Sequence, residues 1–522
     1  MSTDLLTGVR AEQVQARTID GAASWIRAHR VDIAMVVVLA VALGVVHAVG
    51  MNSFPARFDD EGAYMSQAWA VLTRFDLSHY TYWYDHPPLG WLVLAAYTGL
   101  TGGLGRAPYA VAAGREAMLL FHLASVALLY VLARRIGLRR PFAVLAVLIF
   151  GLSPLGIFFH RMVLLDNIGM PFLLAGFVLV LSPKRRLGAH VAAAALLAAA
   201  VLIREIFVLL VPFAIWLYFR NADGENRRYS LALSGVTFFG LLAMYPVFAL
   251  LRGELFPGSG RVSLFGAIAW QLSGRQSSGS IFDPASPAGE VMGGWLTLDP
   301  WILILGLLCA TALLFLRRLR WVGLVVLLYA VMLLRPGYLP VMYVLPALPF
   351  LALSIGGVFD AAWSRATAGA SEERGDGSGW AIRGLVVCGI AALVLTMGPW
   401  YDAGIRRAMA ADADQPFVAA QAWLEDNLEA DDWLLVDAAL WLDVVESGHP
   451  ADQTIWFYKL DSDPGVDVPG GWEAIDYIVA SEVVRNSLYD LPQMELALES
   501  SEVVATFGEG DGRVEIRRIV GS

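Results

Sequence analysis

The feature that most constrains this chain of 522 residues is a series of apolar runs long enough to cross a lipid bilayer. A helix needs about 20 mostly apolar residues to span the hydrocarbon layer. Hydrophobic residues make up 57% of the sequence and charged residues 16%, with a mean hydropathy of +0.59, which excludes an ordinary soluble domain. We therefore predict a polytopic, all-α membrane domain of about eleven spans. They lie at 31–50, 114–133, 141–158, 167–182, 187–203, 206–219, 230–250, 299–316, 320–334, 339–358 and 383–400.

The basic residues between these runs predict their orientation. Arginine and lysine gather in alternate connections, and the side that carries them is the cytoplasmic one. Residues 1–30 become a cytoplasmic tail, and the chain leaves the membrane on the outer side after residue 400. The first apolar run lacks a cleavage pattern, so we expect a multi-pass plasma membrane protein without a removed signal peptide.

Residues 401–522 differ in composition, with 25 acidic and seven basic residues. A helix is predicted at 417–424, buried strands at 433–437 and 477–480, and a closing hairpin from 503–507 and 513–517. We expect a soluble α/β domain outside the membrane that serves the acceptor rather than the chemistry. The net charge of −10 gives no reason to expect a nucleic-acid partner.

The first outer loop, residues 51–113, is too long for a simple connector within the predicted catalytic membrane domain, 31–400. Apolar residues at three- and four-residue steps predict an amphipathic helix over 60–74, lying at the membrane surface. A second helix is predicted to begin at Pro87 or Pro88 and to run through Tyr97. The loop should therefore form a plate of two surface helices.

Asp60 and Glu61 stand in the first turn of the predicted helix, where backbone N–H groups favour ionised carboxylates. The sequence Tyr-Asp-His-Pro-Pro-Leu-Gly follows at 84–90. A carboxylate held at the membrane surface near a rigid turn suits the deprotonation of an acceptor hydroxyl. Other polar residues fall on the same side, which suggests a site open to the outer leaflet; they include His160, Arg161, Asp166, Arg204, Glu205, Arg335 and Tyr338.

Three motifs together resemble a known family. They are Asp-Asp-Glu-Gly-Ala-Tyr at 59–64, Tyr-Asp-His-Pro-Pro-Leu-Gly-Trp at 84–91 and His-Arg-Met-Val-Leu-Leu-Asp at 160–166. The pattern is similar to the protein O-mannosyltransferases and their bacterial relatives, including the aminoarabinose transferases of lipid A. These are GT-C fold glycosyltransferases of the family 39 type, and the resemblance covers roughly residues 31–400.

The resemblance implies an inverting transferase that moves a sugar from a polyprenyl-phosphate donor to a hydroxyl on a protein, lipid or glycan. The aspartate of the family's first-loop Asp-Glu pair acts at the acceptor, and the matching residue here is Asp60. The chain departs from the family at two positions. Trp91 stands where the eukaryotic members have lysine, and His86 stands where the aminoarabinose enzymes have lysine.

An activated anomeric carbon needs one carboxylate for the acceptor proton and cations for the leaving phosphate. Guanidinium groups suit the phosphate because they bind two oxygens and keep their charge. The candidate residues comprise catalytic Asp60, Glu61 and Asp166, donor-phosphate ligands His86, Arg161, Arg204 and Arg335, and substrate-positioning Tyr64, Asp85 and Tyr338. The sequence does not rank the four phosphate ligands. No cofactor is certain, and a divalent metal ion near Asp60, Glu61 and His86 is left open.

Each motif also has a purely structural interpretation. The acidic pair can start a helix, His86 can precede a simple kink, and Arg335 can anchor a helix end. Arg161 with Asp166, and Arg204 with Glu205, can be local ion pairs. The stretch 273–280 is a flexible loop or a substrate lid, and 371–380 is a polar cytoplasmic linker.

The alternative function is a transporter or flippase for a lipid-linked or small polar solute. Transporters tend to have internal repeats and interrupted helices with ion sites at mid-membrane, and neither is apparent in the sequence. A receptor or scaffold would leave the plate of loop helices unexplained.

Overall fold

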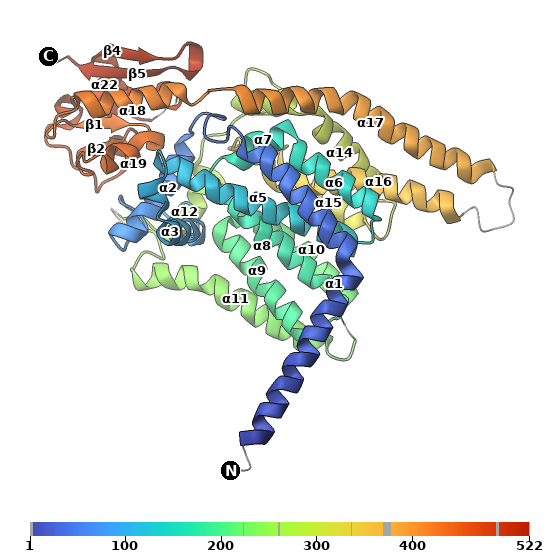
Figure 1. Cartoon of the computed structure of the whole chain (residues 1–522). Coiled ribbons are helices and arrows are strands. Elements are labelled where there is room, and N and C mark those ends of the chain that lie inside the picture. The colour runs from blue at the N-terminus through green and yellow to red at the C-terminus, as the bar shows by residue number, and fades with distance from the viewer. Residues whose placement is uncertain are drawn as a thin grey trace.

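A computed structural model describes residues 4–222, 224–258, 261–335, 337–368, 377–486 and 490–520. A helical domain carries a small α/β domain at one end, and the long helix α17 leads from one to the other (Figure 1). The predicted linker at 371–380 lies mostly outside the described residues.

Each predicted span coincides with a helix. The matching elements are α1 (Asp4–Ala48), α5 (Ala110–Arg135), α6 (Arg140–Leu152) with α7 (Pro154–Arg161), α8 (Leu165–Val180), α9 (Leu187–Ile203), α10 (Val211–Asn221), α11 (Arg227–Leu251), α14 (Pro300–Leu313), α15 (Arg320–Met332), α16 (Leu348–Ala368) and α17 (Gly377–Ala410). By length and composition, five helices of the described residues can cross a membrane, or up to seven if each bent pair is one span. A membrane domain of several apolar helices is thus confirmed, and the count of eleven stays a prediction.

The predicted cytoplasmic tail is helical from Asp4 onward, because α1 begins there and continues into the first span. In Figure 1, the N-terminal part of α1 extends away from the bundle. At the other end of the domain, α17 continues to Ala410, beyond the predicted end of the last span at residue 400.

Two bent helix pairs interrupt the bundle, and a hydrogen bond joins the residues at the two bends. The axis bends by 60° between α6 and α7, and by 97° between α13 (Pro287–Leu298) and α14. The Ser153 hydroxyl caps α7 and donates a hydrogen bond of 2.6 Å to Asp299, whose carboxylate caps α14. These caps satisfy the backbone N–H groups that each break leaves free.

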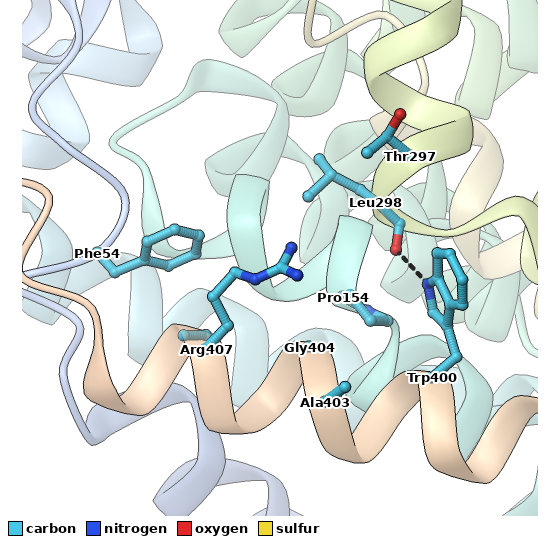
Figure 2. A pocket seen from close by; sticks show the side chains of 9 residues that line it. Phe54, Pro154, Thr297, Leu298, Trp400, Ala403, Gly404 and Arg407 are labelled. Carbon is cyan, nitrogen blue, oxygen red and sulfur yellow. Dashed lines mark hydrogen bonds between the residues drawn. The ribbon is translucent and has the colours of Figure 1, made fainter. Parts of the chain in front are cut away.

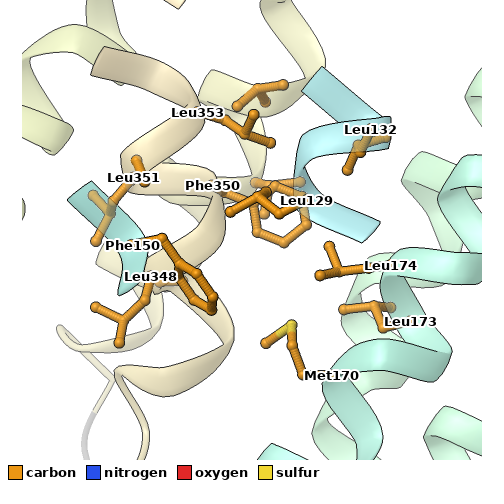
Figure 3. Packing of buried hydrophobic residues seen from close by; sticks show 14 of the residues in the cluster. Leu129, Leu132, Phe150, Met170, Leu173, Leu174, Leu348, Phe350, Leu351 and Leu353 are labelled. Atoms are coloured by element: carbon orange, nitrogen blue, oxygen red, sulfur yellow. The ribbon is translucent and has the colours of Figure 1, made fainter. Parts of the chain in front are cut away.

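The main hydrophobic core lies inside the helical domain. Figure 3 shows Leu129 of α5, Phe150 of α6, Leu173 of α8 and Phe350 of α16 pointing toward one another. All four are almost completely buried. This packing holds α8 against the rest of the bundle, and Asp166 stands in the first turn of that helix.

Both predicted loop helices are present, as α2 (Asp59–Thr73) and α3 (Leu89–Thr101), followed by the short α4 (Gly103–Arg106). The place of the first helix at the membrane surface stays a prediction, but its apolar face is covered by protein. Its apolar residues Tyr64, Met65 and Ala68 are buried in a protein core shared with α3, α5 and the α/β domain. Periodicity indicates that a helix has an apolar face, but it does not tell which apolar partner covers that face.

The α/β domain contains the predicted helix, as α18 (Gln415–Asn427), and the predicted strands. A five-stranded sheet has the order β2-β1-β3-β5-β4, with β1 parallel to β2 and β3, and β5 antiparallel to β3 and β4. Its strands are β1 (Leu434–Val436), β2 (Thr454–Trp456), β3 (Tyr477–Ala480), β4 (Ser501–Phe507) and β5 (Val514–Ile519). The sequence pattern missed β2, which has three residues. The remaining α-helices are α12 (Leu264–Ala269), α19 (Ala438–Glu446), α20 (Lys459–Ser462), α21 (Glu482–Asn486) and α22 (Pro492–Glu499).

A buried cation joins the two domains. The Arg57 guanidinium contacts Asp443 at 2.7 Å and Asp414 at 3.1 Å, and all three side chains are nearly inaccessible to solvent. Nearby, Gly62 of α2 lies against the backbone of α19, where an added Cβ would come within 2.0 Å of the Ala438 carbonyl oxygen. Only glycine permits this approach, so α2 and α19 form one packed unit.

We expect the substitution Arg57→Met to destabilise the protein by about 3–5 kcal/mol, because it leaves two buried carboxylates without their cation. The measurement is the melting temperature of the purified protein in detergent. Arg406→Met is the matched control, since Arg406 pairs with Asp402 at an exposed position. Equal melting temperatures for both variants would contradict the assignment of Arg57 as the link between the domains.

Candidate functional site

Asp60 is a half-buried carboxylate in the first turn of α2. Among the described residues, no hydrogen-bond donor contacts its side chain. Burial raises the pKa of Asp60, although the positive charges of His86 and Arg204 act against this rise. A carboxylate with free oxygens and a raised pKa is suited to accept a proton.

His86, Arg204, Asp166 and Glu205 form one charged cluster. Arg204 Nη1 lies 2.6 Å from His86 Nε2, and Arg204 Nε lies 3.2 Å from an oxygen of Asp166. His86 Nδ1 lies 3.1 Å from Glu205. Burial opposes ionisation of Glu205, but His86 and Arg204 lower its pKa to about 2. The structure thus brings together three predicted site residues from α3, α8 and the end of α9.

Local backbone features place these groups. The residues Pro87 and Pro88 hold His86 just before α3, and Arg204 takes an extended conformation where α9 ends. The His86 carbonyl accepts hydrogen bonds from the hydroxyls of Tyr82 at 2.6 Å and Tyr245 at 3.2 Å. The histidine is therefore held by its backbone as well as by its ring.

Two more predicted residues, Tyr64 and Asp85, lie at the same place. The Tyr64 side chain is buried, with its ring centre 6.4 Å from that of His86. Asp85 interacts electrostatically with both Asp60 and Tyr64, and it adds a second carboxylate to the site.

Tyr338 joins the site from the other side, together with Arg275. The Arg275 guanidinium stacks 3.6 Å from the centre of the Tyr338 ring, and both residues interact electrostatically with Asp60. The predicted loop or lid at 273–280 is attached to this segment, since the Ser278 N–H donates to the Gly337 carbonyl at 3.0 Å.

Glu61 points away from Asp60 and does not share its surroundings. Its carboxylate is fully buried and pairs with Arg115, with Nη2 to Oε2 at 2.7 Å. It also accepts hydrogen bonds from the backbone N–H groups of Phe58 and Val163. All of these contacts fix the start of α2, and they leave the Glu61 carboxylate turned away from the cluster around Arg204.

Arg161 is also used internally. Its guanidinium donates to five backbone carbonyls at 2.7–3.3 Å, at Val46, Val49, Gly50, Phe54 and Ala408. These acceptors include the C-terminal carbonyls of α1, which a helix leaves unpaired. The guanidinium therefore holds helix ends together through both of its terminal nitrogens.

Arg335 is exposed and interacts electrostatically with Tyr343. No described contact joins it to the cluster around Arg204. Of the four predicted phosphate ligands, the structure therefore brings two together, His86 and Arg204.

The metal option near Asp60, Glu61 and His86 does not match the geometry. In the part of the chain that the structure describes, the group of side chains within metal-binding reach of one another is His47, His122 and His160. Glu61 is occupied by Arg115, so a divalent ion at Asp60 would lack one of the three expected ligands.

An apolar groove of about 200 Å³ lies beside the charged cluster. Its walls come from α13, α14, α15 and the start of α16, and they include Trp295, Leu333 and Tyr343. Tyr329 links the groove to the cluster, because it lines the groove and interacts electrostatically with Asp166.

A second hollow of about 210 Å³ lies between α17 and the α7 and α13 region. Figure 2 shows the Arg407 side chain extending into it between Phe54 and Leu298, while the Trp400 ring donates a hydrogen bond of 2.8 Å to the Leu298 carbonyl. None of the predicted site residues lines it.

The α/β domain reaches the site as well. Tyr458 is close enough for its hydroxyl to interact electrostatically with Asp59, Asp85 and Asp60. Burial raises the pKa of Asp59, and the charge of Asp437 in the α/β domain raises it further. The α/β domain therefore packs against the site, and its expected role toward the acceptor stays a prediction.

The sequence analysis missed Arg115, Tyr245 and Tyr458. Arg115 carried a signal, because a charged residue within an apolar span needs a partner. The two tyrosines carried none, since aromatic residues are common throughout the chain.

Comparisons with known proteins identify solved structures with a similar fold. No protein-family model and no curated protein sequence matches the chain. The crystal structure of ArnT from Cupriavidus metallidurans bound to undecaprenyl phosphate is similar, with 20% identity and a TM-score of 0.59, over 93% of this chain and 98% of that one. The Archaeoglobus fulgidus oligosaccharyltransferase AglB, in complex with an inhibitory peptide and a dolichol-phosphate, has 12% identity and a TM-score of 0.55, over 93% and 75%.

Both similar structures are membrane glycosyltransferases, and each is covered over most of its length. The resemblance drawn from the three sequence motifs is confirmed at the level of the fold. The chain has the fold of the GT-C membrane glycosyltransferases.

Proposed function

We propose that this protein transfers a sugar from a polyprenyl-phosphate donor to an acceptor hydroxyl at the outer face of the plasma membrane. The observation that carries the proposal is the free Asp60 carboxylate facing the Arg204–His86 pair beside an apolar groove. A carboxylate, a phosphate-binding cation and an apolar groove for the lipid chain are the three parts that this reaction needs.

The donor would lie with its prenyl chain in the groove and its phosphate at the charged cluster. The groove walls are almost wholly apolar, and Tyr329 stands between the groove and Asp166. Arg204 is held by Asp166 at Nε and by His86 at Nη1, and no described contact involves its Nη2. This nitrogen is free to bind a phosphate oxygen, while both ring nitrogens of His86 already contact Arg204 or Glu205.

In the transfer step, Asp60 takes the proton of the acceptor hydroxyl. The acceptor oxygen attacks the anomeric carbon while the bond from that carbon to the phosphate oxygen breaks, and the phosphate leaves with the electron pair. Arg204 and His86 stabilise the charge that develops on the phosphate. A single displacement of this kind inverts the anomeric centre.

The fold favours this interpretation over the transporter. ArnT is described with undecaprenyl phosphate, and AglB with a dolichol-phosphate and a peptide. Fold alone does not establish activity, so the proposal rests on the residues of the site. The acceptor is a hydroxyl compound, and Tyr64, Asp85, Tyr338 and Arg275 would position it.

We expect Asp60→Asn to lower sugar transfer by on the order of 10² or more while the protein stays folded, because the amide keeps the shape but cannot take a proton. Transfer from a synthetic polyprenyl-phosphate sugar to a hydroxyl acceptor is the measurement. Asp76→Asn is the matched control, since Asp76 is an exposed aspartate of the same outer loop. Transfer by the Asp60 variant at the level of this control would exclude Asp60 as the base.

Arg204→Gln should weaken binding of the polyprenyl phosphate on the order of tenfold or more, since it removes a charged hydrogen-bond donor. Arg335→Gln should leave binding unchanged. Arg161→Gln should instead lower the melting temperature, because it removes five backbone contacts. Binding measured with a fluorescent lipid phosphate tests this ranking, which fails if Arg335 has the largest effect.

We propose an orientation with the N-terminus inside and the α/β domain outside. A variant without Cys309 and Cys388 gives a background free of thiols. On it, Ser280→Cys should react with an impermeant thiol reagent added to intact cells, and Ser371→Cys should react only after the cells are opened. The reverse labelling pattern would place the whole site on the cytoplasmic side.

A further inference from the structure

Three histidines from three helices meet inside the membrane domain, next to the charged cluster. His47 stands near the end of α1, His122 in α5 and His160 in the last turn of α7. Each is at most 6% exposed, and one ring nitrogen from each lies within 4.8 Å of the others. The bend between α6 and α7 directs α7, and with it His160, toward the other two helices.

Hydrogen bonding does not account for this group. Both ring nitrogens of His122 are buried without a partner, and so is Nδ1 of His160. By contrast, His79, His86, His190 and His449 each have at least one bonded ring nitrogen, as His190 has with Ser230 at 3.0 Å. A buried polar atom without a partner costs about 1–3 kcal/mol, so three such atoms together require an explanation.

The ring of His47 is held by a backbone carbonyl, as the rings of metal-bound histidines often are. Its Nε2 lies 2.9 Å from the Gly151 carbonyl oxygen, which fixes the tautomer with the proton on Nε2 and leaves Nδ1 as an acceptor. A backbone carbonyl that holds the far nitrogen is the common outer contact of a metal-bound histidine. Neutral imidazole is the metal-binding form, and a buried setting favours it.

We propose that His47, His122 and His160 bind one transition-metal ion, with Zn²⁺ as the best match. Three imidazoles with one open position form a tetrahedral zinc site. For Zn–N bonds of about 2.0–2.1 Å, the nitrogens would sit roughly 3.4 Å apart. The His47 and His122 rings are stacked with centroids 3.8 Å apart, so binding requires the rings to turn until one nitrogen of each points at the ion.

A small cavity lies beside two of the three histidines. A cavity of about 10 Å³ borders His122 and His160, and Asp166 and Asn167 line it as well. That volume is close to the least that holds one water. Because Asp166 also contacts Arg204, the ion would lie directly behind the donor-phosphate cluster and fasten α1 to α5 and α7 there.

The test is the metal content of the full chain, purified by a tag without histidine. After incubation with excess Zn²⁺ and dialysis, we expect about one ion per chain by elemental analysis. His122→Phe keeps a ring of similar size beside Phe150 and should hold less than a tenth of that. His190→Phe is the matched control, since it replaces a buried histidine outside the group, and it should keep the ion.

Two further measurements keep the result interpretable. Asp60→Asn should retain the ion, which separates this site from a metal at the acceptor carboxylate. A chelator should lower the melting temperature of the unsubstituted protein and of the His190 variant but not that of His122→Phe. The proposal is overturned if the unsubstituted protein takes up no Zn²⁺ or Co²⁺, or if His122→Phe holds as much metal as the control.

Discussion

The buried ion pair between Glu61 and Arg115 fixes the geometry on which the rest of the site depends. Both side chains are completely buried, and the Glu61 carboxylate also accepts the N–H groups of Phe58 and Val163. Arg115 donates in addition to the carbonyls of Met51 and Pro55. Loss of either charge would leave the other buried and unpaired, at a cost of about 3–5 kcal/mol. The pair thus joins the α1–α2 connection, α2, α5 and the α7–α8 connection at one point.

Asp60 owes its position to that pair. Adjacent helical residues point about 100° apart, so a Glu61 that faces the interior leaves Asp60 facing the open side. The α/β domain closes α2 from the other side, through the contact of Gly62 with α19 and the Arg57 bridge. A single short helix therefore carries a structural carboxylate and a free one side by side, with opposite surroundings.

Three arginines of the membrane domain show the same division between structural groups and groups that can bind a ligand. Both terminal nitrogens of Arg115 and of Arg161 donate to carboxylate or carbonyl oxygens. Arg204 contacts Asp166 through Nε and His86 through Nη1, and its Nη2 has no described contact. Residue type alone does not separate these roles, because every arginine offers the same donors. What distinguishes them is the number of acceptors that surround each guanidinium.

The sequence by itself determined the apolar spans, the two loop helices, the acidic α/β domain and the motif that contains Asp60, because composition, periodicity and turn chemistry are local properties. Only the tertiary structure decided that Glu61 pairs with a buried arginine and that Arg161 binds backbone carbonyls. It also decided that protein covers the apolar face of α2 and that three histidines far apart in sequence meet. These depend on which helices lie side by side, and that is set by packing between segments that no local pattern encodes.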